Sequence, residues 1–105
     1  MPAVQRYITW DAAPGKQAEM MKLMREAVPL WERHGAKVRI FGNLLSGADA
    51  TTISFIAEYP SMAAFAAASD GTAADSEIQA FQAKVAAAMV GKLVYGSLST
   101  ELPSR

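Results

Sequence analysis

The chain has 105 residues, 51% of them hydrophobic, and a formal net charge of zero, so we expect one domain with a modest core and no nucleic-acid surface. The absence of cysteine excludes disulfides, thiolate metal sites and cysteine nucleophiles, and a single histidine means that a multi-histidine metal site can form only between subunits. Because no stretch is long and apolar enough to span a membrane and the N-terminus lacks a signal-peptide pattern, a soluble cytoplasmic protein without membrane contacts is expected.

The first third of the chain predicts a strand followed by a helix. Residues 3–10, AVQRYITW, are rich in β-branched and aromatic side chains, which is typical of a strand. Pro14 suits the first turn of a helix, which we expect to continue to His34 and to end at Gly35 in a left-handed cap. Apolar residues recur at steps of three and four, so the helix presents one face to the core: Met20, Leu23, Met24, Ala27, Trp31 and His34.

The middle of the chain predicts a hairpin, with strands at 36–45 and 51–59 joined by a turn at 46–50. A symmetric turn would place residue 39 opposite residue 58. One face is then apolar and suited to lie under helices: Val38, Ile40, Leu44, Ile53, Phe55, Ala57 and Tyr59. The other face is mixed: Lys37, Arg39, Phe41, Asn43, Ser54, Ile56 and Glu58. Because the apolar members of the mixed face would be wet in a monomer, we expect a second copy of the chain to cover it.

The second half of the chain predicts a helix that is broken in two. A short helix capped by Ser61 is interrupted at Asp70-Gly71. A longer helix starts at Thr72, with Asp75 as its capping-box partner, and ends at Gly91. The longer helix has an apolar stripe: Ile78, Phe81, Val85, Ala88 and Met89. The last strand is expected at 92–100.

This order of elements, β-α-β-β-α-β, defines the expected fold. It is the ferredoxin-like arrangement, an α+β fold with a four-stranded antiparallel sheet and helices on one face. Residues 1–105 form a single domain, in which the halves 3–45 and 51–100 repeat the same β-α-β plan. A polar tail follows at 101–105.

Three segments resemble those of dimeric α+β barrel proteins. They are the strand-to-helix junction ISFIAEYPSMAAFAAA, the helix exit ERHGAKV and the closing strand GKLVYGSL. The superfamily includes antibiotic-biosynthesis-monooxygenase-like, NIPSNAP-like and EthD-like small proteins, and the resemblance covers nearly the whole chain. It implies a homodimer in which two four-stranded sheets face each other, with the helices outside and a pocket between helices and sheet. It implies a fold and leaves the activity open.

The candidate site is a pocket expected under the end of the first predicted helix, with His34 at its rim. His34 suits a catalytic general base because its ordinary pKa is near neutrality, and the alternative is a histidine that caps the helix. Trp31, one turn earlier, suits the wall of a substrate pocket, and the alternative is a core residue. Tyr7 and Arg6 on the first strand are the candidate substrate-binding groups opposite, and structural roles are the alternative.

Two classes of function fit these residues. The first is an enzyme without metal or cofactor, either a monooxygenase-like or an isomerase-like protein acting on a small, partly aromatic molecule. The second is a non-catalytic dimeric barrel that binds a ligand or is associated with stress. Haem-degrading members of the superfamily use a histidine of the second helical region as the axial ligand and an asparagine near the first strand. Residues 61–90 of this chain contain no histidine and the first strand contains no asparagine, so haem degradation by that route is disfavoured. An enzyme should have a closed pocket of roughly 300 Å³ or more with several converging polar groups, whereas a structural barrel should pack Trp31, Phe65 and Phe81 together without a void.

Overall fold

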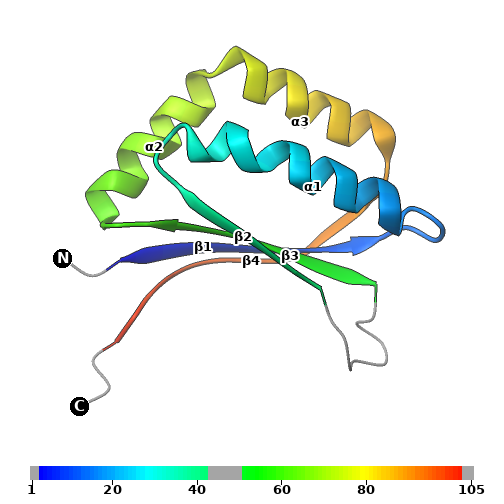
Figure 1. The fold of residues 1–105 in the computed structure, drawn as a ribbon, viewed down its shortest axis with the longest axis horizontal. Helices are drawn as coiled ribbons and strands as arrows, with labels where there is room; N and C mark the ends of the chain where they lie inside the picture. Colours follow the sequence, from blue (N-terminus) through cyan, green and yellow to red (C-terminus); the bar gives the residue numbers. More distant parts are fainter. Residues whose placement is uncertain (1–2, 43–50, 103–105) are drawn as a thin grey trace.

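The computed structural model describes residues 3–42 and 51–102 and has the predicted ferredoxin-like α+β fold (Figure 1). In chain order the elements are β1 (Val4–Ala12), α1 (Gln17–Glu32), β2 (Lys37–Gly42), β3 (Thr52–Tyr59), α2 (Met62–Ala74), α3 (Ser76–Ala88) and β4 (Gly91–Thr100). The strands form one antiparallel sheet in the order β2-β3-β1-β4. All three helices lie on the same side of this sheet (Figure 1). The turn predicted at 46–50, with Asn43 and Leu44, lies outside the described residues.

Helix α1 forms where apolar residues recur at helical spacing, and it buries five of them: Met20, Leu23, Met24, Ala27 and Leu30. Trp31 and His34, predicted to share the buried stripe, are only partly buried. The helix begins at Gln17, later than the predicted start at Pro14, which lies in the preceding turn. Gly35 has a φ of +95°, so the predicted left-handed residue after the helix is confirmed.

The second helical region breaks later than predicted. Helix α2 continues through Asp70 and Gly71 to Ala74, and the break lies at Asp75, whose backbone is extended. Gly71 is tolerated inside the helix because the His34 ring packs against it. A Cβ atom at Gly71 would lie 2.7 Å from Nδ1 of His34, which is closer than side chains can approach.

Helix α3 also ends differently from the prediction. Met89, not Gly91, adopts the left-handed conformation after the helix, with a φ of 50°. Met89 was predicted to be part of the buried stripe, but it is 76% exposed because the chain leaves the helix at that point. Gly91 instead begins β4 at a close approach of chains, where a Cβ atom would overlap the carbonyl oxygen of Asp11 and the methyl group of Met20.

The β2–β3 register is shifted by two residues from the symmetric hairpin. Arg39 pairs with Ile56, and Glu58 pairs with Lys37. Because a shift of two residues keeps every side chain on its predicted face, the apolar face is confirmed, with its four members in β3 buried: Ile53, Phe55, Ala57 and Tyr59. Nη2 of Arg39 still lies 3.8 Å from Oε2 of Glu58, although both side chains are exposed.

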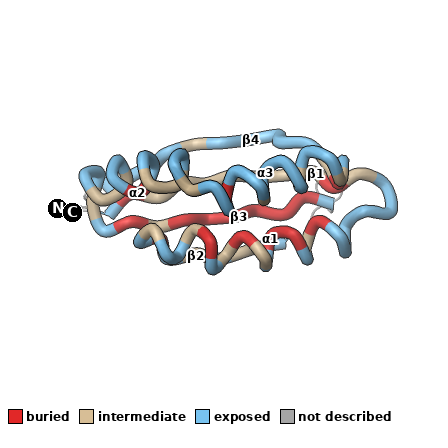
Figure 2. The backbone as a smooth tube through the Cα atoms, turned by 90° about the horizontal axis from the view of Figure 1, so that it is seen from above, coloured by how far each residue is buried: buried red, intermediate tan, exposed pale blue. Residues whose placement is uncertain are grey.

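The core lies between the helices and the central strands. Figure 2 shows β3 buried along most of its length, whereas β4 is exposed along the edge of the sheet beyond α3. No helix of the described ranges lies on the other face of the sheet (Figure 1). Ser54 and Ile56 on that face are nevertheless buried, so Ile56 is not wet in the monomer as expected. This open face carries Phe41, which is 51% exposed, and Tyr95, which is 55% exposed.

Candidate functional site

A pocket of about 850 Å³ lies between the helices and the sheet. Its floor is formed by β1 and β3, including Ile8 and Phe55, and its roof by α1 and α3, including Trp31 and Phe81. The volume is within the range of small-molecule sites. The lining is mostly apolar, and three polar side chains border the pocket: Asp11, Gln82 and Lys92.

Trp31 is the wall residue that the sequence predicted. Its ring meets Phe55 with centroids 5.9 Å apart and Phe81 with centroids 6.2 Å apart, both in edge-to-face geometry. Phe65 does not join this cluster, because its ring packs on Tyr59 at 5.3 Å. Of the three residues expected to pack together in a structural barrel, Trp31 and Phe81 are in contact, while the Phe65 ring packs with Tyr59.

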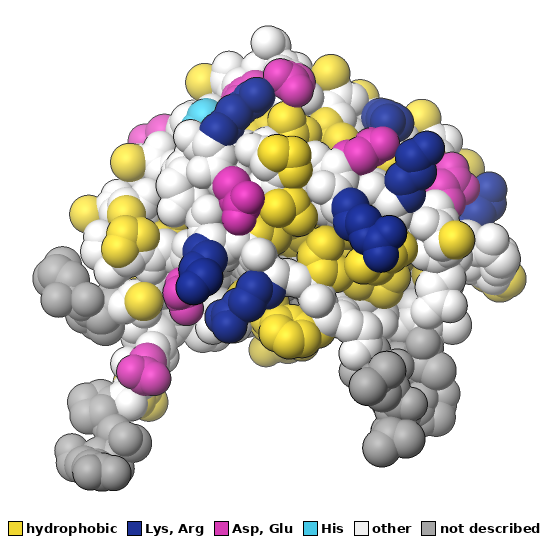
Figure 3. Space-filling model, viewed as in Figure 1, with side chains coloured by type: hydrophobic (Ala, Val, Ile, Leu, Met, Phe, Trp, Pro, Cys, Tyr) yellow, Lys and Arg dark blue, Asp and Glu magenta, His cyan; other side chains and the backbone are white. Residues whose placement is uncertain are grey.

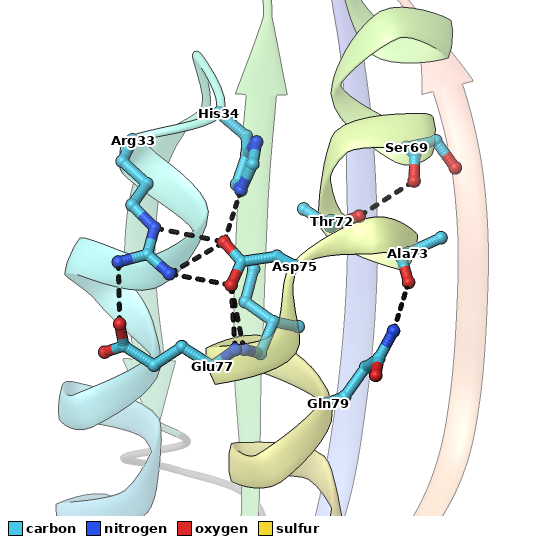
Figure 4. Close-up of polar contacts among 9 residues, drawn as sticks. Arg33, His34, Ser69, Thr72, Ala73, Asp75, Glu77 and Gln79 are labelled. Carbon is cyan, nitrogen blue, oxygen red and sulfur yellow. Dashed lines mark hydrogen bonds and ion pairs between the residues drawn. The ribbon is translucent and has the colours of Figure 1, made fainter.

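His34 lies away from this pocket, so the position predicted for it at the pocket rim is wrong. It follows the last turn of α1, and its Nε2 is 2.8 Å from Oδ2 of Asp75 between α2 and α3 (Figure 4). Nε2–H can donate this bond to the carboxylate. The physical reason for the error is that the partner of His34 is 41 residues away in the chain and lies over the helix break.

Asp75 is the centre of a clasp formed by Arg33, His34, Asp75 and Glu77. Arg33 donates to both carboxylate oxygens of Asp75, at 2.9 and 2.7 Å from Nη2, and to Glu77 at 3.0 Å from Nη1. Asp75 also caps α3 by accepting the backbone N–H groups of Glu77 and Ile78. The hydrogen bond from His34 and those from Arg33 hold the pKa of the Asp75 carboxyl well below its ordinary value. The clasp joins the end of α1 to the start of α3.

We expect this clasp to make stability depend on acid pH. A carboxyl whose pKa is lowered by folding stabilises the fold above its unfolded pKa of about 3.9, and this contribution is lost as pH falls toward the folded value. Asp75→Asn should therefore lower the melting temperature at pH 7, and the gap to wild type should shrink below about pH 4. Asp70→Asn, at an exposed position of α2, is the control and should show no such gap. A gap for Asp75→Asn that does not change between pH 7 and pH 3 would contradict the clasp.

The two candidate groups on β1 point to opposite faces of the sheet. Tyr7 lies on the open face, where its hydroxyl is 3.1 Å from Oγ of Ser54 and its ring is 5.8 Å from that of Tyr95. The hydrogen bond with Ser54, and to a smaller extent that with Thr9, lowers the pKa of Tyr7 below its ordinary value. Arg6 lies on the helix side, where Nη1 donates to the carbonyl oxygen of Ser97 at 2.9 Å. Of the four predicted site residues, Trp31 alone lines the pocket.

Sequence reasoning made Asp75 the capping-box partner of a helix starting at Thr72, and so missed that Asp75 is itself the N-cap of α3; it also missed the part of the pocket near the end of β1. A signal for Asp75 was present, because an aspartate directly before the apolar stripe that begins at Ile78 is a typical helix N-cap. The pocket floor at Ile8 and Trp10 had no comparable signal. Whether an apolar strand residue is covered or left beside a void depends on how far α3 lies from the sheet.

Charged groups form no large area of one sign on the side of the molecule shown in Figure 3, where acidic and basic side chains are interspersed over α1. Among the described residues, no group of three or more histidine, aspartate or glutamate side chains could hold a metal ion. Within the same ranges, no helix combines the length and the apolar character needed to cross a membrane.

Comparison with solved structures places this fold among known proteins. A putative antibiotic biosynthesis monooxygenase from Bordetella bronchiseptica superimposes with a TM-score of 0.72 at 11% identity, covering 98% of this chain and 100% of the other. An uncharacterised NIPSNAP domain protein from Burkholderia xenovorans gives a TM-score of 0.72 at 19% identity, covering 96% and 94%.

A further neighbour is SnoaB from Streptomyces nogalater, a cofactor-independent oxygenase, in its N63A mutant form. It gives a TM-score of 0.68 at 12% identity and covers 100% of this chain and 96% of the other. These identities establish a common fold alone, and the resemblance to the monooxygenase-like and NIPSNAP proteins is thereby confirmed. No curated protein matches the chain. The family model described as Domain of unknown function (DUF6854) matches residues 7–97, and the chain therefore belongs to the DUF6854 family.

Proposed function

We propose that this protein binds a small, mostly apolar and partly aromatic molecule in the pocket between α1, α3 and the sheet. The observation that carries this proposal is the pocket of about 850 Å³ whose walls include Trp31, Phe55 and Phe81. Aromatic walls of this kind offer edge and face contacts to a flat ring. Few polar side chains border the pocket, so a highly polar ligand would lose its hydration without compensation.

Within this function, a monooxygenase-like reaction is the form of catalysis that we favour. The neighbour SnoaB is described as a cofactor-independent oxygenase, and such chemistry needs an electron-rich substrate that itself supplies electrons to oxygen. A mostly apolar pocket suits it, because excluding water protects reactive intermediates. An isomerase that uses His34 for proton transfer is less well supported, since the His34 ring is bonded to Asp75 outside the pocket lining.

A non-catalytic binding protein is the second candidate. It is supported by the same lining, in which the polar side chains belong to Asp11, Gln82 and Lys92 at the strand ends and on the exposed side of α3. Turnover of a bound aromatic compound in the presence of oxygen, followed as oxygen uptake, separates the two candidates. Oxygen uptake supports the enzyme, and tight binding without turnover supports the binding protein.

The proposal includes a homodimer that forms through the open face of the sheet. This face is partly apolar, with Phe41 and Tyr95 more than half exposed. It also carries hydroxyl groups that already have hydrogen-bond partners within the chain, because the Ser54 hydroxyl is hydrogen-bonded to those of Tyr7 and Thr9 at 3.1 and 2.9 Å. The part of this face that carries the apolar side chains and these hydroxyl groups can be covered at low desolvation cost.

Two neighbouring alanines on α3 provide the test of the pocket. Ala86 and Ala87 are both exposed; of these two residues, Ala86 lines the pocket and Ala87 does not. A thermal-shift screen with aromatic acids, quinones, lactones and haem should give compounds that raise the melting temperature. Ala86→Trp should fill the pocket and weaken such a compound by at least about tenfold, or about 1.4 kcal/mol. Ala87→Trp should leave its affinity unchanged. Equal loss in both variants, or no stabilising compound in the panel, would contradict the proposal.

A further inference from the structure

Arg6 is a cation on the same sheet face as the pocket floor. Along β1, the next side chain on that face belongs to Ile8, which lines the pocket. Ile8 pairs with Phe55 of β3 on one side and with Gly96 of β4 on the other. The row Phe55–Ile8–Gly96 therefore crosses the sheet at one end of the pocket.

The guanidinium of Arg6 extends from its own position toward this row. A Cβ atom at Gly96 would lie 3.3 Å from Nη1, 3.4 Å from Nη2 and 3.8 Å from Cζ of Arg6. The guanidinium thus occupies the space above Gly96 that a larger residue would fill. Gly96 belongs to β4 and is paired with Ile8, and neighbouring strands are about 4.8 Å apart. The guanidinium above Gly96 therefore lies beside Ile8, at the end of the pocket floor.

The charge of Arg6 has no acidic partner in the described part of the chain. Arg33 and Arg39 both lie within 4.0 Å of carboxylates, whereas the ion pairs among residues 3–42 and 51–102 do not include Arg6. Nη1 of Arg6 instead donates to the carbonyl oxygen of Ser97 at 2.9 Å. A guanidinium has five N–H donors, and a partly buried one is costly without a counter-charge.

We propose that Arg6 binds an anionic oxygen group of the ligand. This inference rests on the proposed function of the pocket and adds to it the class of molecule: an aromatic body under α3, with a carboxylate or ionised hydroxyl at the Arg6 end. The fork of a guanidinium matches two oxygens of a carboxylate, and such bonds are about twice as strong as neutral ones. Gly96 is then the residue that keeps the approach to the guanidinium open.

The test compares two probes of equal shape, 2-naphthoate and its neutral analogue 2-naphthamide, by calorimetry at pH 7. Wild type should bind 2-naphthoate at least about tenfold more tightly than the amide, as expected for a charge-assisted bond. Arg6→Gln should abolish this preference and leave the amide affinity near that of wild type. Arg25→Gln removes the same charge from an exposed position on α1 and should keep the preference.

Equal affinities of wild type for the two probes, or a preference that survives in Arg6→Gln, would overturn the role of Arg6 while leaving the pocket in place. Failure of both probes to bind would overturn the proposed function as well. Arg6→Met, which keeps an unbranched side chain, replaces Arg6→Gln if that variant does not fold, and it should lose the preference in the same way.

Discussion

Replacing Phe55 by alanine is expected to lower the free energy of unfolding by about 3–5 kcal/mol, the range found when large aromatic residues are truncated in packed sites. Phe55 is only 8% exposed, lies on the central strand β3 and meets the ring of Trp31 at 5.9 Å. Truncation of Phe55 removes buried apolar surface from the floor of the pocket. The neighbouring side chains can fill the resulting cavity only in part.

Chemical denaturation followed by far-UV circular dichroism measures this loss. Leu102→Ala is the control, because this side chain is 76% exposed and its removal should change stability by less than about 0.5 kcal/mol. A loss below about 1 kcal/mol for Phe55→Ala would show that the helices do not cover β3 as described.

Placing a charge on the open face is expected to abolish the proposed dimer. Wild type should scatter light with twice the mass of its 11.2 kDa chain at micromolar concentration. In Phe41→Glu, each copy would bury an unpaired carboxylate against the other, which costs several kcal/mol. Association should therefore weaken by at least about a hundredfold, and the variant should elute as a monomer.

Met62→Glu is the matched control for this variant. Met62 lies in α2 and is 51% exposed, the same fraction as Phe41, but it belongs to the helical side of the molecule. This variant should remain dimeric. A monomeric wild type, or equal behaviour of the two variants, would contradict an interface on the open face.

Much of the fold could be predicted because its signals are local. The period of two in residues 51–59 predicts which side chains lie under the helices, and the periods of three and four in the long helical regions predict which side chains face the sheet. Gly35 after α1 and Ser61 before α2 were correctly predicted as a left-handed residue and an N-cap. The faces of β3 remained correct despite the shifted register, because the shift was an even number of residues.

The errors arise where a distant contact overrides a local signal. Asp70-Gly71 looks like a helix break, but the His34 ring from α1 fills the space beside Gly71 and the helix continues. Asp75, which caps α3 and forms hydrogen bonds with Arg33 and His34, becomes the break instead. His34 was predicted near the pocket from its place on the helix face, yet its hydrogen-bond partner is Asp75, which is 41 residues away in the sequence, between α2 and α3.

The central claim is that the pocket beneath α1 and α3 binds a small aromatic molecule, and the two tryptophans of the chain test it most directly. Trp10 and Trp31 both line the pocket, so each indole N–H group reports on it in a nitrogen–proton correlation NMR spectrum. Titration with 2-naphthamide should shift both indole signals with a common affinity and leave the backbone signals of Phe41 and Tyr95 unchanged. Indole signals that stay fixed while those of the open face move would contradict the claim.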